Sequence, residues 1–360
     1  MKIGIIGTGR IAKRFVPEAM CVPGAEITAV YNPHPGSAER FVREVWGDTA
    51  AGKLPEGIAD NKATVPKAYA FAAKEGSRES GVDPGTSCIP EDFWNVTDAV
   101  YIATPHETHY EYILKALRQG KHVLCEKPMT LSSKEAAECF QFAEEKGLIL
   151  MEGLKTAYCP GYRELLQTVS DGIIGEVKFV ESCFTKLESP DRRELTDRGY
   201  GGSFTELGSY VLLPILDLFG SGYESVRFSS IRNGLGIDTF TKLDLDYPGR
   251  MASAVCGLGV KAEGRLLISG TKGFIKADAP WWKTRHFEIH FEDPSKMQSF
   301  DIPFEGDGLR YEIGEFQRQI EGICEEATDG PDEEDRKAAK DRSICMADLM
   351  EKHLKAGGRA

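Results

Sequence analysis

Residues 2–12 have the sequence KIGIIGTGRIA, and this stretch decides the fold expected for the first part of the chain. The β-branched run 2–6 predicts a strand, and the longer apolar spacing that follows predicts a helix. Residues 7–12 between them fit the pattern Gly-x-Gly-x-x-Gly/Ala. Its first glycine permits a tight turn, its second lets the backbone approach a pyrophosphate, and its small third residue lets the helix pack closely on the strand. An ordinary glycine turn is the alternative, but the context favours dinucleotide binding, with contacts from Gly7, Thr8, Gly9, Arg10 and Ile11.

The pattern after this turn predicts a parallel α/β sheet. A second strand is expected at 25–32, about 20 residues later, where a βαβ unit meets the adenosine ribose. Residues 33–66 interrupt the pattern and are interpreted as an insertion with one short helix at 37–46. Further strands are expected at 98–104, 121–126 and 148–153, and helices at 67–76, 109–120 and 132–147, the last starting at Ser132 or Ser133. Residues 1–154 are therefore predicted to form a Rossmann domain.

The pattern changes after about residue 155. Period-2 alternation separated by turn signals predicts strands at 175–187, 225–232, 238–247, 250–259, 265–270, 273–278 and 286–293. Two helices near 308–324 and 333–356 complete the chain. Residues 155–360 are therefore predicted to form an α+β domain with a large open, mostly antiparallel sheet.

Composition restricts the class of protein. A chain of 360 residues exceeds the size at which a single core keeps growing, so two domains are expected. The net charge is -12 and no basic run is present, which argues against nucleic acid and anionic membranes as partners. The nine cysteines are scattered, without the paired spacing of a zinc or redox site. With no leader-like or membrane-spanning segment, we expect a cytoplasmic protein.

The residue at the end of the second strand bears on cofactor choice. NAD sites typically place Asp or Glu there, whereas NADP sites have an arginine nearby. This chain has Asn32, which can hydrogen-bond a hydroxyl without repelling a phosphate, and Arg40 or Arg43 could reach a phosphate. The balance leans toward NAD.

Two further segments follow predicted strands at the edge where open α/β sheets bind ligands. In ATPHETHY (103–110), His106 and His109 could share a helical face, but no third ligand has recognisable zinc spacing. We expect cofactor contacts from Thr104, Pro105, His106 and His109, with a helix cap as the alternative role of the histidines, and no metal. In HVLCEKP (122–128), Glu126 and Lys127 end a strand, and this lysine is either a solvated strand end or a catalytic group.

Five segments, in this order and at these separations, resemble the glucose–fructose oxidoreductase / inositol dehydrogenase / rhizopine catabolism (Gfo/Idh/MocA) family. They are GTGRIA, VYIATPHETHYEYILKALRQGKHVLCEKPM, MEGLKTAYCPGYREL, GIIGEV and GGSFTELGSY. The likeness runs from residue 1 to about 280, apart from the 33–66 insertion. It implies an NAD(P)-dependent oxidoreductase that acts on a carbinol carbon of a sugar, polyol, inositol or cyclic diol.

The resemblance also implies site residues. Lys127 corresponds to the family lysine beside the nicotinamide, with Glu126 next to it, and Tyr210 ends the block ELGSY (206–210) at the second catalytic position. Glu206 stands where aspartate is usual. Tyrosine and lysine are each too basic alone to take the hydroxyl proton, but an adjacent ammonium lowers the pKa of a tyrosine, so the two form a workable acid/base unit.

Other implications stay open. In MEGLKTAYCP (151–160), Tyr158 is the family aromatic, and Lys155 could replace the basic residue usual at Ala157, so Lys155, Tyr158 and Glu206 are candidate substrate contacts. Some relatives use NAD transiently to cleave glycosidic bonds, and others are dinucleotide-binding regulators that need no Lys/Tyr pair. Because alternating apolar residues such as those of VKFVESCFTKL (177–187) would be exposed on an open sheet, we expect a homodimer or homotetramer formed through it.

Overall fold

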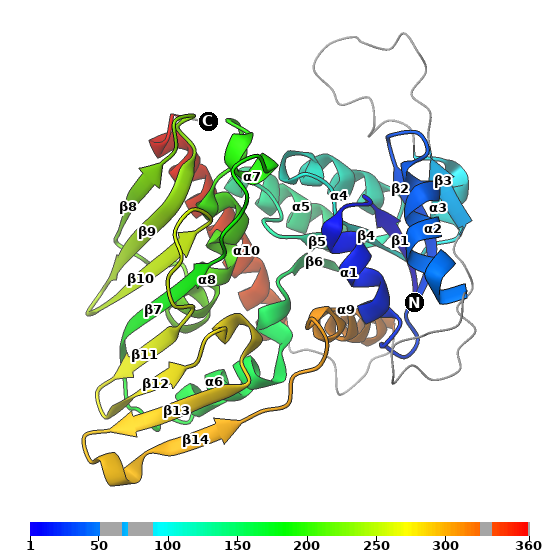
Figure 1. Cartoon of the computed structure of the whole chain (residues 1–360). Coiled ribbons are helices and arrows are strands. Elements are labelled where there is room, and N and C mark those ends of the chain that lie inside the picture. Colours follow the sequence, from blue (N-terminus) through cyan, green and yellow to red (C-terminus); the bar gives the residue numbers. More distant parts are fainter. Residues whose placement is uncertain (51–66, 71–88, 325–332, 359–360) are drawn as a thin grey trace. The chain divides into compact units, whose positions relative to one another are not determined.

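The computed structural model describes residues 1–50, 67–70, 89–324 and 333–358, and the chain divides into two compact units (Figure 1). Unit 1 comprises residues 1–129, 137–153 and 309–332, and unit 2 comprises residues 130–136, 154–308 and 333–360. Each unit contains one sheet, and the two units are described separately below.

Sheet A in unit 1 is parallel throughout and has the strand order β3-β2-β1-β4-β5-β6. This is the order of a dinucleotide-binding Rossmann sheet, so the predicted fold class is confirmed. Its strands are β1 (Lys2–Ile6), β2 (Glu26–Asn32), β3 (Lys67–Ala70), β4 (Ala99–Ile102), β5 (His122–Glu126) and β6 (Leu150–Gly153). All four residues of β4 are buried, as expected for a strand with both faces covered.

The register of sheet A aligns the carboxyl ends of its central strands. Ile6 of β1 pairs with Ile102 of β4, and Ile102 pairs with Cys125 of β5. The segments that follow these strands therefore leave the sheet at one edge. Strand order reverses between β1 and β4, which makes this edge the ligand-binding switch point of an open α/β sheet.

One predicted element of unit 1 is wrong. The alanine-rich segment 67–76 was expected to be helical, but residues 67–70 form β3, which pairs in parallel with β2. Hydrogen bonds to an open sheet edge here outweigh the helix propensity of alanine. Residues 71–76 and the part of the insertion from 51 to 66 lie outside the described residues.

Most helices of unit 1 were predicted, and the short helix expected at 37–46 is confirmed as the first part of α2, whereas the short α3 was not predicted. Helix α1 buries Ala12, Phe15, Val16 and Ala19 along one stripe, the spacing of an amphipathic helix. The helices are α1 (Arg10–Ala19), α2 (Ser37–Ala50), α3 (Glu91–Asn95), α4 (His109–Arg118), α5 (Ser133–Glu145, shared with unit 2) and α9 (Leu309–Cys324).

Helix α9 follows the whole of sheet B in the sequence, yet it packs on α1 in unit 1. The buried Glu18 of α1 accepts a hydrogen bond from the backbone N–H of Arg310 at 3.1 Å and pairs with its guanidinium at 2.9 Å. A carboxylate at the first turn of a helix also interacts favourably with the helix dipole. This contact fixes where α9 begins.

Sheet B in unit 2 has the order β14-β13-β12-β11-β7-β10-β9-β8, and among its pairs only β7 and β10 run parallel. The mostly antiparallel sheet was predicted, except for its last edge strand. Its strands are β7 (Val177–Thr185), β8 (Ser225–Arg232), β9 (Asp238–Tyr247), β10 (Arg250–Gly257), β11 (Leu266–Gly270), β12 (Gly273–Ala277), β13 (His286–Phe291) and β14 (Gln298–Asp301).

Helix α8 (Ser203–Phe219) packs on β7, β10 and β9, and α10 (Glu333–Ala356) packs on α8 (Figure 1). The two helices approach closely at Gly208, where an added Cβ would come within 2.7 Å of the Met350 methyl group. Because α8 lies between a sheet and a helix, it is apolar on nearly every side. The remaining helices of unit 2 are α6 (Pro160–Ser170) and α7 (Arg193–Thr196).

Candidate active site

The glycine turn of unit 1 fits a dinucleotide. Gly7 has φ +105°, and an added Cβ would overlap the carbonyl oxygen of Ala103, so only glycine fits between β1 and the end of β4. Gly9 is the N-cap of α1, and an added Cβ there would meet no protein atom within 4 Å. This open space lies where the second glycine of the motif lets a pyrophosphate approach the backbone. Arg10 and Ile11 form the first turn of α1 beside it.

Asn32 connects this turn to the segment after β2. Its side-chain Nδ2 donates to Thr8 Oγ1 at 2.8 Å, and its Oδ1 accepts from the backbone N–H of His34 at 2.9 Å. The expected ribose contact therefore lies directly beside the glycine turn, held by both of its side-chain ends. An uncharged amide at this position leaves room for either a hydroxyl or a phosphate on the ribose.

The segment after β4 is held to the segment after β5 by His109. The buried ring of His109 contacts the carbonyl oxygens of Pro128, through Nδ1 at 2.9 Å, and Thr104, through Nε2 at 3.0 Å. Burial and the neighbouring His106 lower the pKa of His109 to about 3, although the two carbonyl contacts act in the opposite direction. A neutral ring that holds two loops together has a structural role here, and its predicted cofactor contact stays a prediction.

The other predicted residues of this segment lie at the same edge. Thr104 Oγ1 accepts a hydrogen bond from Thr108 Oγ1 at 2.8 Å, and Pro105 directly precedes the short helix His106–Thr108. The rings of His106 and His109 lie 5.7 Å apart. Within the described ranges no group of three metal-ligating side chains is found, and no helix there is long and apolar enough to cross a bilayer.

Lys127 is not a solvated strand end, because only 8 % of its surface is exposed. Its neighbour Glu126 is also buried and accepts a hydrogen bond from the Tyr101 hydroxyl at 2.5 Å. Tyr101 stacks on Phe15 of α1 at 3.7 Å between ring centroids, which holds this partner rigidly. After the cis Lys127–Pro128 peptide, the Met129 N–H donates to Glu152 Oε1 at 3.0 Å.

Sequence reasoning missed Tyr101 and Glu152, the side chains that hold the Glu-Lys-Pro segment. The available signal was a polar atom within an otherwise apolar predicted strand, as in DAVYIAT and LILMEG. Such buried polar atoms are nearly always hydrogen-bonded, so each indicates a partner on a neighbouring strand.

In unit 2, Glu206 and Tyr210 lie one turn apart on α8. Among residues 203–216 of this helix only these two are half-exposed, and the others are buried. A partly open polar face on a helix otherwise enclosed by the fold is a candidate substrate surface. Over this part of α8, the accessible residues are therefore Glu206 and Tyr210, the two ends of the ELGSY motif.

An aromatic group lies beside this face. The ring of Tyr210 makes an edge contact with Phe184 at 5.2 Å, and Phe184 stacks on Trp282 at 3.5 Å between centroids. The Trp282 carbonyl accepts from Thr156 Oγ1 at 2.9 Å, which connects the group to the short helix Lys155–Tyr158. These contacts connect Tyr210 to the short helix that contains Lys155 and Tyr158.

The side chains of Lys155 and Tyr158 also interact within unit 2. The buried Lys155 ammonium donates to the Asp307 carbonyl at 2.5 Å, and the Arg163 guanidinium lies 5.6 Å from the centre of the Tyr158 ring. A substrate role for either residue stays a prediction.

Comparisons with protein families agree with this geometry. The family model described as an oxidoreductase family with an NAD-binding Rossmann fold matches residues 1–154, and the model of the GFO/IDH/MocA C-terminal domain matches residues 162–276. The chain belongs to the Gfo/Idh/MocA family. It is therefore an NAD(P)-dependent oxidoreductase, as the sequence predicted.

Curated relatives match almost the full length of this Gfo/Idh/MocA chain. Trans-1,2-dihydrobenzene-1,2-diol dehydrogenase of Bos taurus is 26 % identical over 99 % of this chain and 97 % of the relative. The NADP⁺-dependent scyllo-inositol 2-dehydrogenase of Bacillus subtilis is 27 % identical, with the same coverage.

Solved structures share the fold. A 3-ketoreductase from Actinomadura kijaniata, solved with NADP and TDP-benzene, has a TM-score of 0.73 and 21 % identity over 99 % of this chain and 97 % of its own. UDP-N-acetylglucosamine 3-dehydrogenase from Acidithiobacillus ferrooxidans has a TM-score of 0.70 and 19 % identity over 99 % and 98 %.

The two glycines of the turn predict opposite mutant phenotypes. Gly9→Ala should fold with wild-type thermal stability, because its Cβ has open space, but it should raise the Kd for NADPH at least about tenfold by filling the pyrophosphate position. Gly7→Ala should be destabilised by about 1–3 kcal/mol or more, because alanine is strained at positive φ and overlaps Ala103. Thermal unfolding and fluorescence titration measure the two effects, and unaltered NADPH affinity in Gly9→Ala would contradict the assignment.

Proposed function

We propose that this oxidoreductase transfers hydride between a nicotinamide dinucleotide and the carbinol carbon of a cyclic polyol, sugar or cyclic diol, with Lys127 and Tyr210 exchanging the hydroxyl proton. The observation that carries the proposal is the burial of Lys127 at the carboxyl edge of sheet A, the edge that also contains the open turn at Gly9. Burying an ammonium is costly, so a lysine kept at a ligand edge is best explained by chemistry performed there.

The surface around Tyr210 supports a ring-shaped substrate. Trp282 is half-buried and stacks on the buried Phe184, so its ring offers an apolar surface against which the C–H face of a cyclitol or sugar can pack, and Glu206 offers a carboxylate to its hydroxyls. The two curated relatives act on a cyclic dihydrodiol and on an inositol, both of which are six-membered rings that carry hydroxyl groups. We infer that the substrate of this chain belongs to the same class.

The chemistry divides between the cofactor and the protein. A nicotinamide dinucleotide bound at this edge would supply the hydride acceptor for the substrate C–H bond. As that bond breaks, the hydroxyl proton has to leave, and in this proposal Tyr210 accepts it and the Lys127 ammonium stabilises the phenolate that forms. In the reverse direction the same pair returns the proton to the alkoxide oxygen.

Replacing the proposed catalytic lysine tests this function. Lys127→Met should lower kcat at least about 100-fold on the best substrate of a panel of inositols, sugars and cyclic diols, while the Kd for the dinucleotide changes little. Lys121→Met is the matched control, because Lys121 begins the same strand segment but donates to the Thr97 carbonyl. Absorbance at 340 nm measures turnover.

Three results of this assay would count against the proposal. Near-wild-type turnover in Lys127→Met excludes Lys127 as a proton-transfer group. Release of the leaving group from an aryl glycoside without net absorbance change indicates a glycosidase-type member of the family. Dinucleotide binding without turnover on any member of the panel indicates a regulator.

We further propose that the adenosine ribose lies at Asn32 and that the site accepts NADP as well as NAD. The sequence alone leaned toward NAD. Asn32 carries no charge that would repel a 2′-phosphate, and the exposed Arg40 lies in the first turns of α2, with its Nη2 3.2 Å from Ser37 Oγ. Arg40→Ala should therefore raise the KM for NADP by about tenfold and leave the KM for NAD unchanged. Arg43→Ala tests the other candidate arginine of α2 in the same way, and equal effects of Arg40→Ala on the KM of both cofactors would contradict this role.

We propose that a second copy of the chain covers the outer face of sheet B. Strand pairing aligns Phe274, Ser269, Phe179 and Met251 in one row across β12, β11, β7 and β10, and Met251 is 56 % and Phe274 38 % exposed. Met251→Asp should shift the protein toward monomer, whereas Leu235→Asp, at an exposed residue of the turn between β8 and β9, should not. Light scattering at micromolar concentration measures the change, and a monomeric wild type would exclude the interface.

A cytoplasmic location is also proposed. Among the described side chains, seven cysteines are free thiols, and all of these except Cys21 are buried; the seven are Cys21, Cys125, Cys139, Cys159, Cys183, Cys256 and Cys345. Free thiols of this kind are typical of proteins in a reducing compartment. Fractionation of cells that express the chain would test the location.

A further inference from the structure

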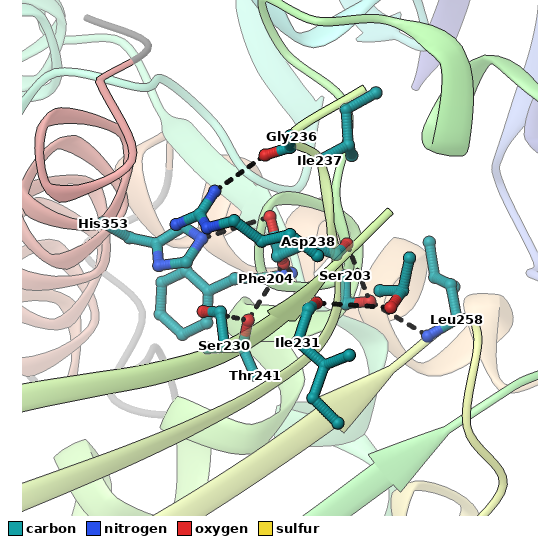
Figure 2. A network of polar contacts seen from close by, with 12 residues as sticks. Ser203, Phe204, Ser230, Ile231, Gly236, Ile237, Asp238, Thr241, Leu258 and His353 are labelled. Carbon is teal, nitrogen blue, oxygen red and sulfur yellow. Dashed lines mark hydrogen bonds and ion pairs between the residues drawn. The ribbon is translucent and has the colours of Figure 1, made fainter. Parts of the chain in front are cut away.

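Helix α8, which contains Glu206 and Tyr210, has no cap of its own. Its N-cap is Gly202, at φ +127°, which offers no side chain to the free N–H groups of the first turn. The cap comes from strand β9 instead, because the Phe204 N–H donates to Asp238 Oδ2 at 2.9 Å (Figure 2). An added Cβ at Gly202 would overlap Asp238 Oδ1, so glycine also makes space for this carboxylate.

A second contact holds the first residue of α8. Ser203 Oγ donates to the Asp238 carbonyl at 3.2 Å and accepts from the Leu258 N–H at 3.0 Å (Figure 2). The start of the helix is thereby fixed to β9 and to the end of β10. Both contacts depend on the position of Asp238.

The C-terminal helix completes the arrangement through His353. Its Nε2 lies 3.2 Å from Asp238 Oδ1, and the two residues are 1 % and 0 % exposed. The ring packs against Phe204 at 4.7 Å and Phe228 at 5.1 Å between centroids. Thr241 Oγ1 donates to Asp238 Oδ2 at 3.0 Å, so the buried carboxylate has partners at both oxygens.

Burying Asp238 and His353 together costs free energy, because both side chains lose their hydration. The contacts of this pair lie at the start of α8. A buried carboxylate is tolerated only when hydrogen bonds, a counter-charge or a helix N-terminus compensate for its lost hydration, and Asp238 has hydrogen bonds and the N-terminus of α8. Replacing it with an apolar core would stabilise the unit as well or better. A role in placing the start of α8 accounts for its presence.

The first turn of α8 determines where the accessible face points. Glu206 donates its N–H to the Gly202 carbonyl at 3.1 Å, and Tyr210 lies one turn beyond Glu206. Because an α-helix is stiff over such a short distance, a rotation or shift of its first turn moves both side chains. A displacement of about 1 Å at a reacting group can cost on the order of 100-fold in rate.

We propose that Asp238 and His353 are positioning residues for the reaction: together they hold the first turn of α8 and thereby aim Glu206 and Tyr210 at the substrate. The catalytic part of this proposal rests on the function proposed above for Tyr210. The C-terminal helix, far from any motif of the family, is thus a support of the active-site face.

The chain contains a matched control pair between the same two helices. Asp217 of α8 contacts Arg342 of α10 at 2.5 Å and accepts from the Tyr162 hydroxyl at 2.8 Å. Asp217 lies two turns after Tyr210 on the C-terminal half of α8. Its loss should weaken the packing of α10 on α8 without releasing the first turn.

The test compares Asp238→Asn, His353→Leu, His353→Gln and Asp217→Asn in the full chain. Asp238→Asn and His353→Leu should lower kcat about 10- to 100-fold with KM for the dinucleotide within about twofold. His353→Gln, whose amide nitrogen can replace Nε2 as a donor, should recover most of kcat. Asp217→Asn should lower the Tm comparably and keep kcat within about threefold of the wild type.

Amide hydrogen exchange over residues 203–210 is the second measurement and needs no substrate. Exchange should become faster in Asp238→Asn and His353→Leu, and stay as in the wild type in Asp217→Asn. Unchanged exchange in Asp238→Asn and His353→Leu overturns the positioning role, and this result does not depend on finding a substrate. Absence of wild-type turnover on every substrate tested would exclude the proposed function separately. Equal losses of kcat in Asp238→Asn and Asp217→Asn would show a general stability effect and also overturn it.

Discussion

The candidate cofactor site depends on one constraint, the close approach of the turn after β1 to the end of β4. The positive φ of Gly7 and the absence of a Cβ next to Ala103 allow these segments to leave the sheet side by side. The parallel register then brings the end of β5 to the same edge. Any side chain at residue 7 would force these segments apart and separate the Gly9 space from the buried Lys127.

A second feature of the fold is a carboxylate that contacts a backbone N–H group at the start of a helix. Three helices begin at a carboxylate from a distant part of the chain: α8 at Asp238, α9 at Glu18, and α5 at Glu351, whose Oε2 lies 3.3 Å from the Ser133 N–H. Each contact satisfies an N–H group that the helix leaves free and places a negative charge at the positive end of the helix dipole. Helix position and tertiary packing are thereby specified by the same atoms, which gives each carboxylate a structural role that a local serine cap would not have.

Local pattern predicted most elements because burial enforces it. Strands of sheet B, such as β9, alternate between buried and more exposed positions, and the two C-terminal helices were expected almost where α9 and α10 lie. The segment 67–70 was predicted as a helix because its alanines favour one in isolation, whereas the free edge of β2 decides its state. Strand β14 was missed because its short sequence QSFD, largely exposed at a sheet edge, carries no apolar alternation.

The candidate site shows the same difference between what the sequence predicts and what tertiary contacts decide. Residue types at short spacing determined the glycine turn, whereas the family and the candidates Lys127 and Tyr210 came from the resemblance of five segments in order along the chain. Tertiary structure decided what holds them. Tyr101 on Glu126, Glu152 on Met129 and Asp238 with His353 at the start of α8 are pairs between residues 23 to 115 positions apart. No local pattern encodes such pairs, because whether a polar side chain finds its partner depends on which strands and helices become neighbours after folding.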